Sequence, residues 1–155
     1  MRRSDRAVTD PFELQAILDQ CKILRLAMQD ANGLYIVPLS FGYVNQGEQL
    51  SFYIHSAEEG RKVSAMTPGC PVAFEMDCRF QLQESDIACK YSCSYASLIG
   101  NGQAVAVTDP AEKAKGLAAI MLHQSGKTFQ FTEEQTNGVA IFRVDVTSMT
   151  GKQKR

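Results

Sequence analysis

The residues with the clearest chemical potential lie together in residues 50–66, in the middle of the chain. This segment opens with aromatic and branched side chains, which favour a half-buried β-strand. Ser56 follows the strand, and Glu59 stands three residues later, a spacing typical of a capping box at the start of a helix. The free amide groups at the start of a helix attract anions. Two cations follow directly, namely Arg61 and Lys62.

This arrangement predicts an anion-binding site at the turn between the strand and the helix. The alternative is an ordinary strand-to-helix turn with a solvated, charged face. His55 precedes Ser56, and a histidine there serves either as a structural hydrogen-bonding group or as a proton donor near neutral pH. The second histidine, His123, falls near the end of an expected helix, where a cation is mildly favoured, and we expect it to be structural.

The five cysteines are odd in number and unevenly spaced, which argues against a disulfide framework and favours a reducing, cytoplasmic compartment. Cys89 and Cys93, with only two histidines in the chain, make a poor zinc pattern, so we expect no metal and free thiols that are buried or half-buried. The arginines near the N-terminus are not followed by an apolar stretch, so no secretory signal is expected. No apolar run approaches the ~20 residues of a membrane helix.

The composition predicts one domain over residues 1–155, because 155 residues with 45% hydrophobic and 21% charged residues can bury a core. A net charge of -1 does not indicate a nucleic-acid-binding protein. Both ends of the chain are nevertheless basic, and we expect them to be solvated tails. The cations concerned are Arg2, Arg3, Arg6, Lys152, Lys154 and Arg155.

Two further helices are predicted from a shared starting pattern, in which an aspartate precedes a proline and a glutamate follows two residues later. Asp10 caps the first, whose apolar stripe is formed by Leu14, Ile17, Leu18 and Cys21. Asp109 caps the second, whose buried face is formed by Leu117, Ile120 and Met121.

Six strands are predicted, and short turns at residues 30–33 and 45–48 make their neighbours antiparallel. Pro38 cannot donate to a ladder, which predicts either a bulge that leaves backbone groups for a ligand or an edge strand. Gly100 and Gly102 break the longest segment and indicate a bulge, a barrel corner or a close backbone approach. Residues 81–90 are expected to form a loop. The predicted strands are residues 23–29, 34–44, 50–54, 71–80, 91–107 and 138–149.

Bent strands and few helices suggest a closed or nearly closed barrel. Six stretches of the chain, in order and with similar spacing, resemble the nitroimidazole-resistance (Nim-like) proteins of the pyridoxamine 5'-phosphate oxidase-like group of flavin-binding proteins. They are residues 1–6, 23–27, 35–43, 55–62, 95–104 and 150–152. The resemblance implies a mainly β fold with peripheral helices, namely a six-stranded antiparallel split β-barrel that binds FMN.

The resemblance also implies a homodimer with two flavin sites at its interface, occupied by FMN or FAD. In such proteins the flavin phosphate lies near the turn and helix after the third strand. That phosphate position corresponds here to His55, Ser56, Ala57, Gly60, Arg61 and Lys62. The flavin ring lies along the second strand, which corresponds to Val37, Pro38, Leu39 and Ser40. The residues implied for the second subunit are Tyr95, Ser97 and Gly100. For Lys152 the alternative to a tail residue is contact with the partner's cofactor.

The chain departs from the family pattern at three places. Ser40 stands where family members often have asparagine, Ile54 where they have phenylalanine, and Asn101 where they have phenylalanine. Ser40 keeps a hydroxyl but lacks the amide that would meet the ring edge. No basic cluster that would hold pyridoxine phosphate is evident, so vitamin B6 synthesis is not predicted.

The resemblance favours an FMN-dependent oxidoreductase that passes electrons from NADH or NADPH to a small acceptor such as a nitroaromatic compound, with His55 as the implied proton source. A non-catalytic flavin-binding protein for storage, sensing or delivery is the alternative. The absence of a Gly-x-Gly-x-x-Gly dinucleotide fingerprint is compatible with that alternative. A third hypothesis is a dimeric interaction domain whose pocket no longer binds a ligand.

Overall fold

The computed structural model describes residues 3–47 and 49–155, and these form one eight-stranded antiparallel sheet with three α-helices. The strands are β1 (Ala7–Val8), β2 (Ile23–Asp30), β3 (Gly33–Ser40), β4 (Gly42–Gln46), β5 (Gln49–Ser56), β6 (Cys70–Gln83), β7 (Ser92–Val107) and β8 (Ala140–Lys154). The helices are α1 (Pro11–Gln20), α2 (Arg61–Met66) and α3 (Pro110–Ser125). Glu48 of the predicted turn at 45–48, and Met1 and Arg2 of the basic N-terminus, lie outside the described residues.

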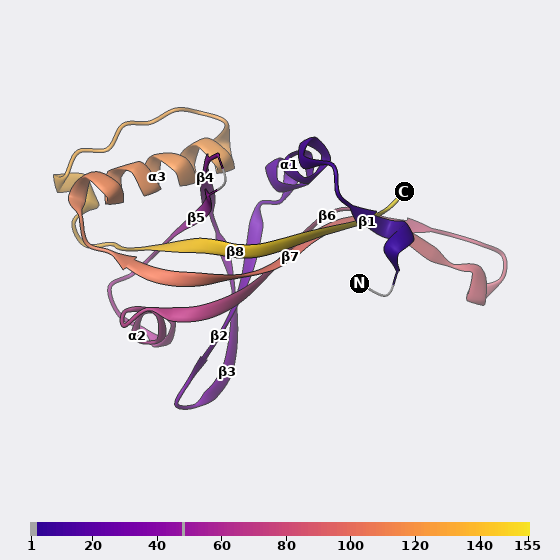
Figure 1. Ribbon diagram of the computed structural model, residues 1–155, viewed down its shortest axis with the longest axis horizontal. Coiled ribbons are helices and arrows are strands. Elements are labelled where there is room, and N and C mark those ends of the chain that lie inside the picture. Colours follow the sequence, from indigo (N-terminus) through magenta and orange to yellow (C-terminus); the bar gives the residue numbers. More distant parts are fainter. Residues whose placement is uncertain (1–2, 48) are drawn as a thin grey trace.

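The order of the strands requires the sheet to curl into a barrel (Figure 1). The order is β3-β2-β6-β7-β8-β5-β4, and β1 pairs with β8 outside this path. The two ends of the order, β3 and β4, are separated in the chain by Phe41 alone. The two edges of the sheet must therefore lie close together, which is the geometry of a split barrel. The predicted mainly β split-barrel fold is confirmed.

The strand count differs from the prediction at two places. The predicted strand 34–44 divides at Phe41 into β3 and β4, which belong to opposite edges of the sheet. The two residues of β1, expected in a tail, pair with β8. Both differences concern pairing partners that are distant in the sequence, and local residue patterns do not specify such partners.

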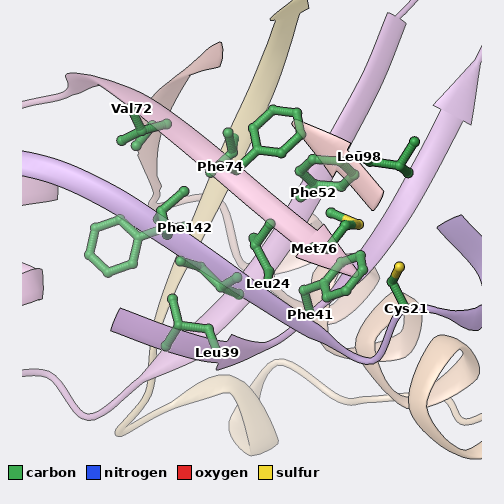
Figure 2. Packing of buried hydrophobic residues seen from close by; sticks show 14 of the residues in the cluster. Cys21, Leu24, Leu39, Phe41, Phe52, Val72, Phe74, Met76, Leu98 and Phe142 are labelled. Atoms are coloured by element: carbon green, nitrogen blue, oxygen red, sulfur yellow. The ribbon is translucent and has the colours of Figure 1, made fainter. Parts of the chain in front are cut away.

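Alternating residues of the strands fill the barrel with apolar side chains (Figure 2). Phe52 lies at the centre, with its ring 5.5 Å from that of Phe41 and 5.0 Å from that of Phe74 in edge-to-face contacts. Leu24, Leu26 and Met28 point inward from β2, as their alternation predicts. Each fully buried side chain of this size contributes about 1.5–3 kcal/mol, so this core is the main source of stability.

The helices α1 and α3 start as predicted and cover different parts of the barrel. Asp10 accepts a hydrogen bond from the backbone of Phe12, and Asp109 accepts one from the backbone of Glu112. Helix α3 packs on β4 and β5 through Ile120, which is buried there, while Leu117 and Met121 are half-buried.

The capping box predicted at Ser56 is wrong. Ser56 is the last residue of β5, and α2 begins only at Arg61, with Gly60 in the capping position and no side-chain cap. Gly60 has a φ of 125°, a value that favours glycine, so the chain turns there and not at Ser56. The helix ends at Met66, with Thr67 as its C-cap.

Strands β6, β7 and β8 are longer or more continuous than predicted. β6 runs through residues 81–83 of the predicted loop and, with β7, forms a hairpin that extends away from the barrel (Figure 1). Gly100 and Gly102 do not break β7; a register shift against β8 falls between Asn101 and Gly102, so the predicted bulge is confirmed. β8 continues to Lys154, which makes Lys152 and Lys154 strand residues and not a tail.

Candidate functional site

The end of β5 presents the candidate phosphate-binding segment. His55 is exposed, whereas Ser56 points into the protein and is only 6% exposed. The Ser56 hydroxyl oxygen is buried and has no hydrogen-bond partner among the described residues. Ala57 and Gly60 lie in the exposed loop that follows, and Arg61 and Lys62 begin α2. A buried hydroxyl without a partner is rare in proteins and calls for an explanation, such as backbone strain, a catalytic role or a bound water or ion.

Arg61 joins this segment to the hairpin of β2 and β3. Its Nε lies 2.7 Å and its Nη2 2.9 Å from the two carboxylate oxygens of Asp30. Its guanidinium carbon lies 4.4 Å from the centre of the Tyr35 ring. The hydrogen bonds from Arg61 hold the pKa of Asp30 below its usual value. Because Arg61 is fixed on two sides, its remaining terminal nitrogen, Nη1, is held in a defined position.

Sequence reasoning did not identify Asp30 or Tyr35 as part of this site. The Asx-type contact that Asp30 makes with the backbone of Asn32, 2.8 Å long, belongs to the turn that the sequence predicted. The pairing of Asp30 with Arg61 spans 31 positions of the chain, and no local pattern indicates it.

Strand β3 carries the four residues implied for the flavin ring. Leu39 is buried in the core, Val37 is half-buried, and Pro38 and Ser40 are exposed on the outer face. Pro38 is in register with Arg25, and β3 pairs only with β2. Of the two predictions for Pro38, the structure bears out the edge strand, and it records no bulge between β2 and β3.

The three residues implied for a second subunit lie on β7, away from β3. The sheet order puts β2 and β6 between these strands, so one chain does not bring Tyr95 or Ser97 to Pro38. Gly100 is buried, and a Cβ atom there would lie 2.3 Å from the Phe74 ring and 2.2 Å from the Ser148 carbonyl oxygen. Gly100 is therefore required for packing, as the predicted close approach implies.

A second polar cluster, which the sequence did not reveal, connects α3 to β8. Arg143 forms ion pairs with Glu112 of α3 and with Asp145, whose Oδ1 lies 2.8 Å from Nε. Tyr53 donates to Glu112 at 3.1 Å, and Ser51 donates to Asp145 at 2.8 Å. The two carboxylates raise the pKa of Arg143 above its usual value. These groups line a cleft of about 630 Å³, but they satisfy one another and leave no group of obvious reactivity.

The surroundings of His123 and of the cysteines indicate structural roles. His123 is half-buried, and its Nε2 lies 2.7 Å from the Cys21 carbonyl oxygen. The five cysteines are free, and all but the exposed Cys89 are at least half-buried. Within the described ranges, no group of three or more His, Cys, Asp or Glu side chains is arranged to hold a metal. None of the helices in these ranges is long and apolar enough to cross a membrane.

The curled sheet with its edges at β3 and β4 defines the class of split β-barrels. A family model described as pyridoxamine 5'-phosphate oxidase matches residues 10–153, and the chain belongs to this family. The resemblance found in the sequence is thereby confirmed at the level of the family. A search of curated proteins found no match to this chain.

Solved structures with the same fold include a candidate 5-nitroimidazole antibiotic resistance protein from Bacteroides thetaiotaomicron. It is 27% identical, with a TM-score of 0.79 over 95% of this chain and 86% of that protein. A flavocytochrome from Azotobacter vinelandii is 17% identical, with a TM-score of 0.78 over 100% of this chain and 72% of that one. An FAD-binding protein from Mycobacterium smegmatis is 23% identical, with a TM-score of 0.62 over 96% and 97% of the two chains.

Proposed function

We propose that this protein binds a flavin, FMN in the first instance, and acts as an oxidoreductase on a small acceptor. The observation that carries the proposal is the contact of Arg61 with Asp30 and Tyr35, which attaches the phosphate-binding segment to the hairpin containing β3. Membership of the pyridoxamine 5'-phosphate oxidase family supports it, as do similar structures described as a flavocytochrome and an FAD-binding protein.

The residues present fit a flavin phosphate. Arg61 offers Nη1, because its other donors are engaged by Asp30, and Lys62 adds a mobile charge beside it. The partnerless hydroxyl of Ser56 supplies a polar group in the same segment. Because Asp30 takes the fork of the guanidinium, Arg61 would meet the phosphate through a single contact.

The ring of the flavin would lie along β3, where Pro38 and Ser40 face outward and Val37 and Leu39 support them from within. A bound flavin supplies reversible transfer of electrons, which the side chains of this protein do not provide by themselves. His55 is exposed at the edge of the phosphate-binding segment, and it is the residue we propose to hold a proton for the acceptor.

The proposed assembly is a homodimer in which Tyr95, Ser97 and Gly100 of one chain approach the flavin of the other. Its support is that these residues lie on β7, apart from the other candidate residues of their own chain. NADH or NADPH is the proposed electron donor, and a nitroaromatic compound is the proposed class of acceptor. A flavin-binding protein without turnover remains the second candidate, since the described residues show no nucleotide fingerprint for the donor.

The test is titration of the apoprotein with FMN, followed by flavin fluorescence. We expect the Arg61→Ala/Lys62→Ala double variant to bind FMN at least tenfold more weakly, because each charge-assisted hydrogen bond contributes about 1.5–3 kcal/mol. The matched control is Lys115→Ala/Lys127→Ala, which removes two exposed cations elsewhere. Equal FMN affinity in the two double variants would contradict the assignment of the phosphate site.

Anaerobic mixing of the flavin-loaded protein with NADH or NADPH separates the two candidate functions. Bleaching of the flavin absorbance, followed by its return when a nitroaromatic acceptor is added, is expected for the oxidoreductase. A flavin that neither donor bleaches points to the non-catalytic protein. The His55→Gln variant should retain FMN affinity but lose turnover if His55 supplies the proton.

A further inference from the structure

One arginine on the outer face of the barrel keeps an edge of its guanidinium open. Arg25 of β2 is half-buried, and its Nη1 lies 2.9 Å from a Glu75 oxygen and 2.5 Å from an Asp77 oxygen on β6. Both ion pairs therefore use the same nitrogen. Over residues 3–47 and 49–155, Nε and Nη2 of Arg25 have no hydrogen-bond partner. The edge formed by these two nitrogens, here called the free edge, retains its donors.

Three other arginines of the chain show what this edge of a guanidinium binds. Arg3, Arg61 and Arg143 each direct Nε and Nη2 at the two oxygens of one carboxylate, at distances of 2.7–3.0 Å. Two parallel N–H donors match a planar group that carries two oxygens. Arg25 has the same donors without such a group, so its free edge is open to a ligand of that shape.

The free edge belongs to a side chain beside the strand proposed for the flavin ring. Arg25 is in register with Pro38 of β3 on one side and with Glu75 of β6 on the other. Residues opposite each other in an antiparallel pair have Cα atoms about 4.5–5.5 Å apart and share one face of the sheet. Pro38 is exposed on the outer face, so Arg25 lies next to it on that face.

The charges around Arg25 favour a neutral ligand. Hydrogen bonds from Arg25 to Asp77 and Glu75 raise the pKa of the arginine, which stays protonated. Two carboxylates and one guanidinium give this group a net charge of −1. The outer face around it is apolar, with Ile23 42% and Ile36 61% exposed. A nitro group is planar, neutral and carries two oxygens, so it meets the free edge without the repulsion that an anion would meet from the carboxylates.

We propose that Arg25 determines specificity by binding, through its free edge, a planar two-oxygen group of the electron acceptor, namely the nitro group of a nitroaromatic compound. The inference rests on the proposed function, since the acceptor must lie beside the flavin to receive electrons. Conversion of a nitro to a nitroso group takes up two electrons and two protons and releases water; the electrons come from NADH or NADPH by way of the flavin. The nitro oxygens gain negative charge as electrons arrive, so Arg25 stabilises the reacting group more than the bound acceptor.

The test is titration of the FMN-loaded protein with nitrobenzene and with benzoate, followed by the change in the flavin absorbance spectrum. We expect saturable binding of nitrobenzene, and at least tenfold weaker binding by Arg25→Lys, which keeps the charge but lacks the planar fork. The matched control is Arg143→Lys, because Arg143 also pairs with two carboxylates but lies beside α3. This control should bind nitrobenzene like the wild type, and both variants should keep the wild-type affinity for FMN.

Turnover gives a readout that a purely structural role of Arg25 would not change. Arg25→Lys should lower kcat/KM for nitrobenzene at least tenfold but leave the reduction of 1,4-benzoquinone unchanged, because a quinone carries no two oxygens on one atom. Unchanged quinone reduction also shows that the variant is folded. An equal loss of activity with both acceptors would contradict a role of Arg25 in specificity.

The binding experiment separates this inference from the proposed function. A wild type that takes up no FMN overturns both. FMN binding without any spectral change at millimolar nitrobenzene or benzoate overturns the role of Arg25 alone, as does equal binding by Arg25→Lys and Arg143→Lys. A carboxylate shares the two-oxygen shape, so tighter binding of benzoate than of nitrobenzene, lost in Arg25→Lys, identifies a carboxylate as the bound group and overturns the assignment of the nitro group.

Discussion

His123 is held in its neutral form by its surroundings. Its ring lies 4.6 Å from the Phe41 ring and 5.3 Å from the Tyr43 ring, and its Nε2 contacts the Cys21 carbonyl oxygen at 2.7 Å. Burial lowers the pKa of His123, and the positive charge of Lys22 lowers it further, although the Cys21 carbonyl and Asp19 oppose the shift. The helix end that would favour a cation is therefore outweighed by burial.

This environment predicts a loss of stability in mild acid. Because the folded pKa of His123 is lowered, the unfolded chain takes up the proton first as the pH falls. The contribution of neutral His123 is complete above the unfolded pKa of about 6.5 and is lost as the pH falls through the folded pKa. Urea denaturation at pH 8 and pH 5 should show a smaller difference in unfolding free energy for His123→Gln than for the wild type. The control, Lys115→Gln on the exposed face of α3, should keep the wild-type difference; an unchanged difference in His123→Gln would contradict the prediction.

At the scale of the element, the packing of β7 against its neighbouring strands requires that residue 100 has no side chain. A Cβ atom there would meet the Phe74 ring and the Ser148 carbonyl oxygen at 2.3 and 2.2 Å, distances that require the strands to move apart. Overpacking of this kind costs about 1–3 kcal/mol, so we expect Gly100→Ala to lower the free energy of unfolding by that amount. Gln103→Ala, on the exposed side of the same strand, should be nearly neutral. Chemical denaturation measures both, and equal stability of the two variants would mean that the strands adjust without strain.

The sequence predicts those elements whose signals are local. Asp10 and Asp109 cap α1 and α3 because each side chain bonds a backbone group two or three residues away. The capping box at Ser56 fails because Ser56 is the last residue of β5, which pairs with β8 over residues 51–56 and buries this side chain. A capping side chain must lie at the start of a helix. The pairing with β8, a strand far along the chain, holds Ser56 in a strand instead.

The candidate site likewise has one part that local sequence predicts and another that depends on contacts between distant residues. His55, Arg61 and Lys62 stand close together in the sequence and are therefore found from it. The contact of Asp30 with Arg61 depends on the curled sheet, and the approach of Ala7 to Lys152 depends on the pairing of β1 with β8. These contacts join residues distant in the chain, so composition led us to expect solvated tails where the structure has paired strands.

At the scale of the whole molecule, one outer face of the barrel is apolar and uncovered. The register places Ile36 beside Ala27, and Ala27 beside Ala73, across β3, β2 and β6. Leu34 is 85% exposed, Ile36 61% and Ile99 55%. The charges on this face pair with one another, as Arg25 lies 2.9 Å from Glu75 and 2.5 Å from Asp77. Exposed apolar patches of this kind mark protein–protein contacts.

This face is the one on which the proposed homodimer depends, since it carries Pro38 and Ser40 of β3 and Ser97 of β7. Stable dimers bury about 1,200–2,000 Å² in total, and a charge placed in the middle of such an area is costly. Ile36→Lys should therefore convert a dimer into a monomer in sedimentation velocity experiments and weaken FMN binding together with it, because the flavin site would be left incomplete. Phe12→Lys, which changes an equally apolar residue that is 85% exposed on α1, should do neither. A wild type that sediments as a monomer at micromolar concentration, yet binds FMN tightly, would show that one chain suffices for the flavin.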